Sequence, residues 1–521
     1  MSKICSSGQE LNSKVLAGAN KLADLVACTL GPRGNNVILK QKDGMPIITK
    51  DGVTVSKFVD LDDPFENAGA QILKQASSQT NTNAGDGTTT STVLARELLN
   101  QSQKFILAGA STTELKRGMD IGLRRVLEEL KEMSHPVESL EEIRSVATIS
   151  ANGDESIGNL ISEAVEMVGN NGAISVEEAK SLDTTLDVVE GFQFDSGYFS
   201  TSFITNQRRA SVEYDETLVL VTDYKIDQLN QILHILEIAA RDGRPFIIVA
   251  EQLEGQALAA LIMNTVRGTM KVAAIKAPGY GEERTAALED LALSIGATFV
   301  SARKDKVLAD VKMSDLGVCK SVEAIKNRST FVGAHGDQDK IKERIELLQE
   351  LIKQTDDIQE CERLQNRVTR LVSGVAIIKV GASTDVEMIE RKHRIEDALE
   401  AVAAAQEEGI VPGGGLALVN CRHFKDDDLL GDKLTGAQIL RNSLVGPLKQ
   451  MSKNANLSHE VILSKIDESD QGIGWNFATG ELVDMCANGI IDPVKVTRNA
   501  LTNAVSVSST LITTAAAVIE D

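Results

Sequence analysis

The segment Ala84–Thr92 joins a Gly-Asp-Gly turn to a run of hydroxyl side chains at the start of a predicted helix. Free backbone N–H groups and the positive end of a helix suit a phosphate group, and glycines let the backbone approach it closely. The carboxylate of Asp86 could hold Mg²⁺ beside such a phosphate. Because Gly and Asp also dominate turns for purely conformational reasons, the segment taken alone favours a plain turn followed by a Thr N-cap.

Two further carboxylates are candidates for chemistry elsewhere in the chain. Asp51 follows a predicted strand within Thr49–Thr54, where an Asp-Gly hairpin turn is the simpler interpretation. Asp397 lies in a predicted helix around Arg394–Leu399, whose charged neighbours are typical of a solvated face. Neither carboxylate identifies an activity in isolation.

Motifs of several well-defined enzyme classes are missing from the sequence. It contains no GxxxxGK[ST] phosphate loop and no GxGxxG after a predicted strand. Its histidines have no HExxH or other metal-ligand spacing, and it has no GxSxG nucleophile elbow. These P-loop, dinucleotide-binding, metalloprotease and hydrolase classes are therefore excluded at the level of motifs.

The elements that position the three carboxylates differ along the chain. Helical spacing of apolar residues predicts helices over 11–30, 66–78, 88–107 and 114–133, with strands at 36–39 and 46–49. Ala-rich helices return after residue 395. A helical domain built from both termini, with other domains inserted, is the economical architecture.

The middle of the chain has a different pattern. β-rich runs at 217–222, 245–250 and 272–276 alternate with predicted helices at 228–242, 255–267 and 283–296. This alternation indicates an α/β domain. Two amphipathic helices, separated at 355–357, follow between 337 and 371 and predict a helical hairpin.

Composition limits the partners of this protein. The 521 residues include 54 Lys and Arg against 75 Asp and Glu, a net charge of −21. Such a chain repels phosphate backbones and anionic lipid headgroups, so binding to nucleic acid or to a membrane surface is disfavoured. Aromatic residues make up only 3% of the chain, so the cores must be built from Ala, Val, Ile and Leu.

Cysteine usage and the first residues predict a location. Six cysteines are scattered without CxxC or CxxH spacing, which signals neither a zinc site nor a disulfide framework. The first nine residues lack the features of a secretory signal or a transit peptide. We therefore expect a soluble protein of a reduced cytoplasm.

Ten segments occur in the order found in group I chaperonins of the GroEL type, and together they span nearly the whole chain. They are Thr29–Val37, Ile48–Val55, Gly85–Thr90, Leu115–Asp120, Thr148–Asn152, Leu186–Asp195, Val272–Gly281, Gly374–Ala382, Pro412–Gly415 and Ile491–Arg498. The sequence thus resembles a multidomain α and α/β chaperonin. The resemblance implies a helical equatorial domain (1–132 and 408–521), a small α/β intermediate domain (133–189 and 376–407) and an α/β apical domain (190–375).

The resemblance also implies an ATP site in the equatorial domain, with Mg²⁺ and K⁺ as cofactors. The expected ATP-binding residues are Thr29, Leu30, Gly31, Pro32, Lys50, Asp86, Gly87, Thr88, Thr89, Thr90, Gly414, Asn476, Ala478 and Asp492. Within this set, Asp86 would ligate Mg²⁺, Thr29 and Lys50 would hold K⁺ through their backbones, and Asp492 would contact the ribose. Asp397 would orient the attacking water and Asp51 would assist it, a division that suits phosphoryl transfer.

The expected partners also follow from the resemblance. They are unfolded polypeptide clients, further copies of the chain in a sevenfold ring, and a co-chaperonin lid. The client groove would comprise Tyr198, Phe199, Phe203, Leu233, Leu236, Leu258, Ile262 and Met263. Taken alone, the helical spacing of these apolar residues favours an ordinary core face. The resemblance favours an exposed groove instead, because non-directional burial of apolar side chains accepts many sequences.

Several positions depart from the family pattern. Ser196 stands where a basic residue is usual, so an interdomain salt bridge is in doubt, and Ser202 replaces an aromatic residue of the groove. Phe477 replaces a small residue near the expected adenine, and the Gly-Gly-Met tail is missing. These departures predict an outlying, virus-encoded member that works in the cytoplasm of its host.

Two other functions stay open at this point. The first is a passive holdase or structural ring that binds unfolded chains without productive ATP turnover. The second, less favoured, is an unrelated Mg²⁺-dependent phosphotransferase that uses Asp51 and Asp86. Steady-state phosphate release separates the ATP-driven chaperonin from the holdase.

Overall fold

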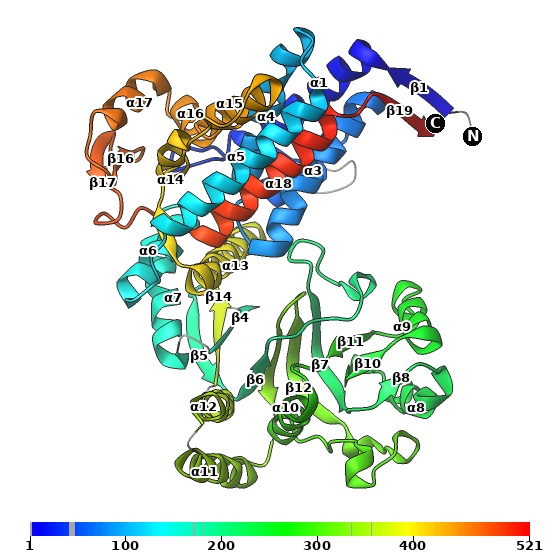
Figure 1. Cartoon of the computed structure of the whole chain (residues 1–521). Helices are drawn as coiled ribbons and strands as arrows, with labels where there is room; N and C mark the ends of the chain where they lie inside the picture. Colours follow the sequence, from blue (N-terminus) through cyan, green and yellow to red (C-terminus); the bar gives the residue numbers. More distant parts are fainter. Residues whose placement is uncertain are drawn as a thin grey trace. The chain divides into compact units, whose positions relative to one another are not determined.

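The computed structural model describes residues 3–40, 47–169, 172–179, 181–334, 336–355, 357–372 and 374–520. The chain forms two compact units. The first comprises Met1–Glu163, Lys180–Leu182 and Val380–Asp521, and the second comprises Ala164–Ala179 and Asp183–Lys379. Both ends of the chain therefore belong to one unit, as the helical composition of the ends predicts (Figure 1).

The first unit is mainly helical. Its helices are α1 (Gly8–Ala27), α2 (Gly52–Phe58), α3 (Pro64–Ala84), α4 (Thr88–Leu107), α5 (Thr112–Met133), α6 (Leu140–Ser150), the first part of α7 (Glu155–Val168), α13 (Asp385–Glu408), α14 (Leu416–Asn420), α15 (Gly431–Ser443), α16 (Gly446–Asn454), α17 (His459–Asp467) and α18 (Val494–Ile512). α4 and α18 lie side by side in its centre (Figure 1). Leu, Ala and Val side chains from these helices form the core, as the scarcity of aromatic residues requires.

Helices α1 and α3 approach each other closely because each contributes a glycine to the contact. A Cβ added at Gly18 would lie 1.8 Å from the carbonyl oxygen of Glu66. A Cβ added at Gly69 would lie 2.1 Å from the carbonyl oxygen of Val15. Any side chain at either position would force the two backbones apart.

Small antiparallel sheets complete the first unit. The pairs are β1 (Lys3–Ser7) with β19 (Ala516–Glu520), β2 (Val37–Leu39) with β3 (Ile47–Thr49), β15 (Ile410–Pro412) with β18 (Ile491–Pro493), and β16 (Ile473–Asn476) with β17 (Glu481–Asp484). The pairing of β1 with β19 joins the two ends of the chain, a contact that the sequence pattern did not predict.

A six-stranded mixed sheet forms the centre of the second unit, in the order β11-β9-β7-β12-β13-β6. The strands are β6 (Gly191–Phe194), β7 (Val212–Val221), β9 (Phe246–Ala250), β11 (Val272–Lys276), β12 (Gly317–Ala324) and β13 (Ser329–Ala334). β7, β9 and β11 are parallel neighbours, and β12, β13 and β6 continue the sheet with antiparallel pairing. The helices between the parallel strands confirm the predicted α/β pattern.

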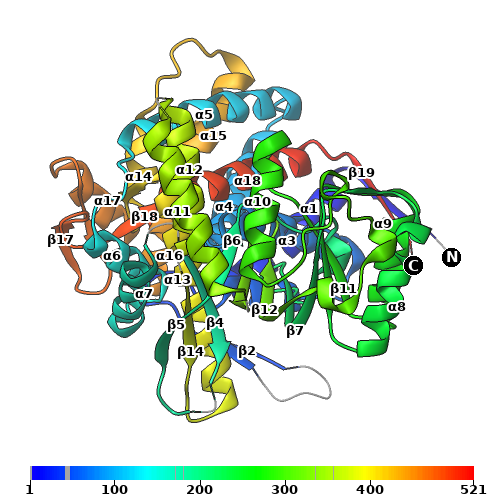
Figure 2. The ribbon, with the colours of Figure 1, turned by 90° about the horizontal axis from the view of Figure 1, so that it is seen from below.

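The other elements of the second unit pack around this sheet. A three-stranded sheet has the order β4 (Ala173–Glu178), β14 (Val375–Val380), β5 (Thr185–Val189), and β8 (Lys225–Ile226) pairs with β10 (Gln252–Leu253). The helices are α8 (Leu233–Asp242), α9 (Gly255–Val266), α10 (Gly281–Ser294), α11 (Gln338–Gln354) and α12 (Ile358–Val372). α11 and α12 lie side by side as the predicted hairpin (Figure 2).

A buried carboxylate ties this hairpin to α10. Asp290 of α10 is 1% exposed, and its two oxygens accept hydrogen bonds from Arg344 Nε at 3.0 Å and Arg367 Nε at 2.7 Å. The paired charges are satisfied by one another, which a buried ion needs in order to be tolerated.

The helices and strands predicted from the sequence are found in the structure with differences at their ends. The expected helix at 88–107 is found as α4, whereas that at 66–78 extends over Pro64–Ala84 and the run at 217–222 is the end of the longer β7. The sequence pattern missed β4, β5, β12, β13 and β14. β12 and β13 pair with each other, and each also pairs with a strand that is distant in the chain. Within the described part of the chain, no helix has the length and apolar character needed to cross a membrane.

Candidate active site

The turn between α3 and α4 requires glycine at two positions. Gly85 ends α3 with φ of 72° and Gly87 precedes α4 with φ of 85°, a region that residues with a Cβ rarely adopt. The turn is also confined, because a Cβ at Gly85 would lie 2.3 Å from Cβ of Glu400, and one at Gly87 would lie 2.7 Å from Cγ1 of Val496. The turn that carries Asp86 is thus held between α13 and α18.

Asp51 lies beside the start of α4 although the two are far apart in sequence. It caps α2 and accepts hydrogen bonds from the backbone N–H groups of Val53 at 2.9 Å and Thr54 at 3.0 Å. A Cβ on the next residue, Gly52, would lie 2.5 Å from Thr89 Oγ1 and 2.8 Å from Thr88 Oγ1. The structure therefore brings Gly52, the residue after Asp51, against the hydroxyl run that the sequence singled out.

Asp86 and Asp492 are carboxylates whose surroundings disfavour their charged forms. Burial raises the pKa of Asp86 above its ordinary value, and the neighbouring charge of Asp51 raises it further. Hydrogen bonds donated by the Gly87 N–H at 2.5 Å and the Ser150 hydroxyl at 3.0 Å act in the opposite direction. Burial, with the charge of Asp86, raises the pKa of Asp492 to about 6. The charge of Asp51 thus acts on Asp86, and the charge of Asp86 acts on Asp492, an arrangement that favours a bound cation.

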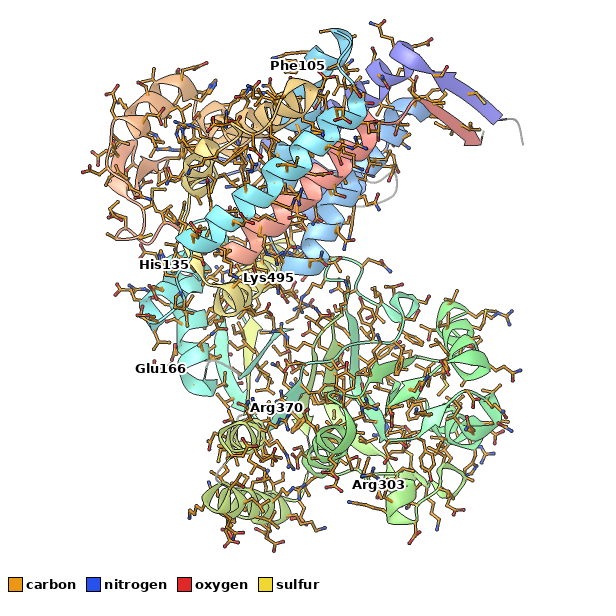
Figure 3. The ribbon with its side chains drawn as sticks, viewed as in Figure 1. Phe105, His135, Glu166, Arg303, Arg370 and Lys495 are labelled. Carbon is orange, nitrogen blue, oxygen red and sulfur yellow. The ribbon has the colours of Figure 1, made fainter. Side chains whose placement is uncertain are left out.

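Asp397 is placed on α13, the helix that confines the turn. Asp397 is half-buried and lies one turn before Glu400, whose side chain adjoins Gly85. α13 is fastened to α18 by Arg498, which donates to Glu408 Oε1 at 2.6 Å and Oε2 at 2.9 Å. Lys495, labelled in Figure 3, pairs with Glu407 of the same helix. The helix that carries the expected water-orienting residue is therefore part of the site.

Lys50 lies near Arg394 and Glu390, two charged residues of α13. Burial, together with the positive charge of Arg394, lowers the pKa of Lys50, while Glu390 raises it. Arg394 in turn donates to Asp154 Oδ2 at 3.2 Å and pairs with Glu390. Lys50 therefore lies near charged side chains of α13, whereas the carboxylate of Asp51 accepts hydrogen bonds at the start of α2.

A second group of loops contains the residues expected to contact the base. The backbone of Thr29–Pro32 is held by Asn454, whose Nδ2 donates to the carbonyl oxygens of Ala27 at 3.0 Å and Leu30 at 2.9 Å. Arg33 Nη2 donates to the carbonyl oxygen of Ala478 at 2.9 Å. These contacts join the 29–33 loop to α16 and to the loop after β16.

The glycines at 413–415 adjoin the same loops. A Cβ at Gly31 would lie 2.9 Å from Cγ of Met451, and one at Gly415 would lie 3.4 Å from Cε of that residue. A Cβ at Gly414 would lie 2.6 Å from Cε of Met485. Met451 therefore lies between the two glycine loops and connects the expected base-binding segments.

Asn476, which was expected to bind ATP, and Phe477, which departs from the family pattern, have local roles in this structure. The Asn476 side chain accepts hydrogen bonds from the backbone N–H groups of Ala478 at 2.9 Å and Thr479 at 3.4 Å, and so shapes its own turn. Phe477 is 5% exposed and packs with Leu416, Leu448 and Met451 in a small apolar cluster. The large side chain at 477 is accommodated in the core.

Two metal sites were expected, a Mg²⁺ site at Asp86 and a K⁺ site at the backbones of Thr29 and Lys50. The described residues contain no group of three or more His, Cys, Asp or Glu side chains arranged to hold a metal ion. Carboxylate and hydroxyl oxygens around Asp86 are nevertheless the donors Mg²⁺ takes when phosphates and waters complete its shell. Thr29 donates its hydroxyl to the carbonyl oxygen of Val26 at 2.8 Å, a local contact that does not bear on the expected potassium site. The potassium site stays a prediction.

The residues expected to bind clients fall into two groups in the second unit. Tyr198, Phe203 and Leu236 are buried, at 6%, 0% and 7% exposed, and belong to the core under the sheet. Leu233 and Met263 are each 46% exposed, and Phe199, Leu258 and Ile262 are half-buried. In this conformation the expectation of an exposed surface is therefore wrong for the first three residues. They face inward because the strands and helices beside them need apolar filling.

Sequence reasoning missed several residues that shape the site. Ser150 lies in the Thr148–Asn152 motif, but nothing in the motif indicated a hydrogen bond to Asp86. Glu400, Arg33, Met451 and Asn454 were also missed, because each acts across a contact between segments distant in sequence. The glycines at 85 and 87 signalled that the backbone comes close to another group, but not which chain segments lie beside them.

The sequence matches the family model described as the TCP-1/cpn60 chaperonin family over residues 22–521. The chain belongs to this chaperonin family. Its fold is similar to that of the chaperonin gp146 from bacteriophage EL of Pseudomonas aeruginosa, crystallised in the presence of ATP-BeFx. The two chains are 22% identical, each is covered to 99%, and the TM-score is 0.70 for one crystal form and 0.63 for another. The expected GroEL-like chaperonin fold is thus confirmed. The virus-encoded origin stays a prediction.

Proposed function

We propose that this chaperonin binds and hydrolyses ATP at the carboxylate cluster of its first unit and uses the turnover to help unfolded polypeptides fold. The observation that carries the proposal is the convergence of Asp51, Asp86 and the hydroxyls of Thr88 and Thr89, with α13 beside them. A chaperonin of the same fold crystallised with ATP-BeFx supports a nucleotide as the ligand.

In this proposal the start of α4 holds the phosphates. The backbone N–H groups of Gly87, Thr88 and Thr89, with the hydroxyls of Thr88–Thr90, donate to phosphate oxygens at the positive end of a 20-residue helix. The base side would be formed by Thr29–Pro32, Gly414, Asn476 and Ala478. Asp492 would contact the ribose.

The donor set fits Mg²⁺, because Asp86 offers a carboxylate beside phosphate-binding groups. When bound, the ion would neutralise phosphate charge and relieve the repulsion among Asp51, Asp86 and Asp492. Asp397 would orient the attacking water and accept its proton, with Asp51 assisting. Lys50 would supply positive charge from the other side, and its backbone with that of Thr29 would hold K⁺.

The experiment is a comparison of two variants on α13. Asp397→Ala is expected to lose about 10² of ATP turnover or more, the contribution of a positioned acid or base. Asp385→Ala makes the same change at an exposed position in the first turn of the helix and is expected to keep its turnover. Nucleotide binding is followed by the fluorescence of Trp475, the one tryptophan of the chain, which packs against the cluster that contains Met451.

The outcomes separate the alternatives. If Asp397→Ala binds nucleotide and hydrolyses it at the wild-type rate, the role given to Asp397 is wrong. If the wild-type protein releases no phosphate from ATP while it still captures denatured protein, the passive holdase is the better description.

Client binding and assembly are proposed on exposed apolar surface. Leu233 and Met263 on α8 and α9, together with the unpredicted Val266 at 68% exposed, offer apolar contacts to unfolded chains. The double variant Leu233→Glu with Met263→Glu should abolish capture of a denatured protein. The control is Leu347→Glu on α11, where the wild-type leucine is exposed to a similar extent, 48%; this variant should still capture the denatured protein.

Association into a ring is supported by two small sheets of the first unit. Ile38 of β2 is 68% exposed and Val518 of β19 is 64% exposed, and both belong to two-stranded sheets with free outer edges among the described strands. Electron microscopy of the purified protein with and without ATP would show whether rings form, whether they are sevenfold and whether a lid protein is needed. A monomer under all conditions would contradict the assembly proposal.

A further inference from the structure

Three polar side chains form a continuous chain of hydrogen bonds inside the first unit. Arg96 of α4 and Gln450 of α16 are buried, and Asn454, one turn after Gln450, is half-buried. Arg96 Nη2 donates to Gln450 Oε1 at 2.7 Å, and Gln450 Nε2 donates to Asn454 Oδ1 at 2.9 Å. The other end of the guanidinium, Arg96 Nη1, donates to Asp24 of α1 at 3.1 Å. We call Arg96, Gln450 and Asn454 the polar relay.

The polar relay ends on the loop that follows α1. Asn454 Nδ2 donates to the carbonyl oxygens of Ala27 at 3.0 Å and Leu30 at 2.9 Å. The loop is closed on itself, because the N–H of Asn35 donates to the carbonyl oxygen of Cys28 at 2.8 Å. Asn454 therefore holds the first half of this loop from the side of α16.

The chemistry of the two ends fixes the orientation of both amides between them. A guanidinium group only donates, so Gln450 must present its amide oxygen to Arg96 and its NH₂ group to Asn454. Backbone carbonyl oxygens only accept, so Asn454 must present its NH₂ group to the loop. The two requirements agree, and each amide has one orientation that satisfies both of its neighbours.

The contact with Leu30 also orients the peptide group that joins it to Gly31. In a planar trans peptide the carbonyl and the N–H point in opposite directions. Since the carbonyl of Leu30 faces Asn454, the N–H of Gly31 points away from it. This N–H has no hydrogen-bond acceptor among the residues that the structure describes. A backbone donor without a partner in a folded loop is suited to an acceptor on a ligand.

We propose that Asn454 is a positioning residue for the nucleotide: it aims the N–H of Gly31 at an acceptor atom of the nucleotide, and Gln450 and Arg96 keep the Asn454 amide in the orientation that this requires. The proposal rests on the proposed function, in which Thr29–Pro32 form part of the base side of the ATP site. The relay begins on α4, whose first turn holds the phosphates in that function, so one network would position both ends of the nucleotide.

Two substitutions interrupt the polar relay at different points and keep the shapes of the side chains. Asn454→Asp keeps the acceptor for Gln450 and removes the donor to the loop carbonyls. Gln450→Glu keeps the acceptor for Arg96, and with it the bond between α4 and α16, but removes the donor to Asn454. The Asn454 amide then turns its NH₂ group towards the new carboxylate and its oxygen towards the loop carbonyls, which repel it.

Matched controls make the same chemical changes on the neighbouring helix α15. Asn442→Asp and Gln438→Glu alter exposed residues of α15, in the same unit. A role that is limited to joining α4 and α16 predicts that Gln450→Glu behaves like its control, because the bond to Arg96 is kept. The positioning role predicts that Gln450→Glu behaves like Asn454→Asp. Thermal denaturation shows whether each protein is folded, and either relay variant alone is sufficient for the test.

The first measurement is amide hydrogen exchange of residues 28–35 without nucleotide. Both relay variants should exchange about tenfold faster in this loop, because it loses the hydrogen bonds that hold it. The second is ADP binding by isothermal titration calorimetry with Mg²⁺, which should weaken about tenfold in both variants. The KM for ATP should rise by a similar factor while kcat stays within about twofold, as expected when binding on the base side is lost equally from the ground and transition states. Both controls should stay within about twofold of the wild type in every measurement.

The outcomes distinguish this proposal from the proposed function. If the wild type binds ADP and both relay variants bind it equally well, the positioning role is overturned and the ATP site stands. Faster exchange of the loop with unchanged ADP affinity also overturns the proposal, because the loop would then be held for stability alone. If the wild type binds no ADP, the proposed function fails and the positioning role fails with it.

Discussion

Asp492 offers a direct measure of the electrostatic strain at the proposed ATP site. Its carboxylate lies on β18, where the backbone pairs with Val411 of β15, and burial with the charge of Asp86 raises its pKa to about 6. Asp492→Asn keeps the shape of the side chain and removes the charge. We expect this variant to be more stable than the wild type when no nucleotide or metal is present.

The magnitude follows from the difference between the two pKa values. A rise from the ordinary 3.8 to about 6 corresponds to roughly 3 kcal/mol at 1.36 kcal/mol per pH unit. The penalty is absent below the unfolded pKa, where the group is protonated in both states, grows as the pH rises and is complete above the folded pKa. The gain from Asp492→Asn should thus be about 3 kcal/mol near pH 7 and about half of that near pH 5.

The assay is urea denaturation followed by the fluorescence of Trp475, which lies in the same unit as Asp492 and is the only tryptophan. Reading one unit avoids the assumption that the whole chain unfolds in one step. Asp470→Asn, at an exposed aspartate of the same unit, is the matched control and should change the midpoint little at either pH.

A double variant tests the cause of the shift. In an Asp86→Asn background the gain from Asp492→Asn should be smaller, because part of the penalty comes from the Asp86 charge. The reasoning is refuted if Asp492→Asn destabilises the unit near pH 7, or if its effect is the same near pH 5 and pH 7. The same variant should bind nucleotide more weakly, as expected when a strained functional group is removed.

Three further predictions concern other parts of the chain. Ser150→Ala removes a hydroxyl that lowers the pKa of Asp86, so the acid limb of the pH profile of ATP turnover should move to higher pH, with Ser145→Ala on the same helix as the control. Asp290→Asn should destabilise the second unit by about 3–5 kcal/mol because two arginines lose a buried partner, and amide exchange in α11 and α12 should accelerate. Burial raises the pKa of Cys319 and of Cys421 to about 12, so both thiols should resist alkylation near pH 8 until the protein unfolds, and rapid native labelling would contradict their burial.

Local sequence signals were sufficient for most helices and for the parallel strands. α4 begins at Thr88 because Gly87 provides the left-handed residue before it and the apolar spacing continues to Leu107. β9 and β11 were predicted because each is a short buried run between helices. Strands such as β12 were missed because their alternating pattern is weak, and their stability comes from pairing with β7 and β13.

The candidate site was predicted as a set of residues, but its geometry was not. The motifs and the family resemblance identified Asp51, Asp86, Asp397 and Asp492. They did not indicate that Ser150 donates to Asp86 or that Glu400 adjoins Gly85, because such contacts depend on how distant helices pack. The same limit explains Tyr198, Phe203 and Leu236, whose apolar character fits either an exposed groove or the buried core in which they lie.

The sequence by itself determined the family, the helical ends around an α/β middle and the chemical types at the proposed ATP site. These depend on residue identity and short-range spacing, which the chain carries whatever its conformation. Only the tertiary structure decided the raised pKa of Asp492 and the burial of three expected client-binding residues. Each of these arises when charges or apolar groups from distant segments share one environment, and burial and electrostatic energy depend on that environment rather than on position in the chain.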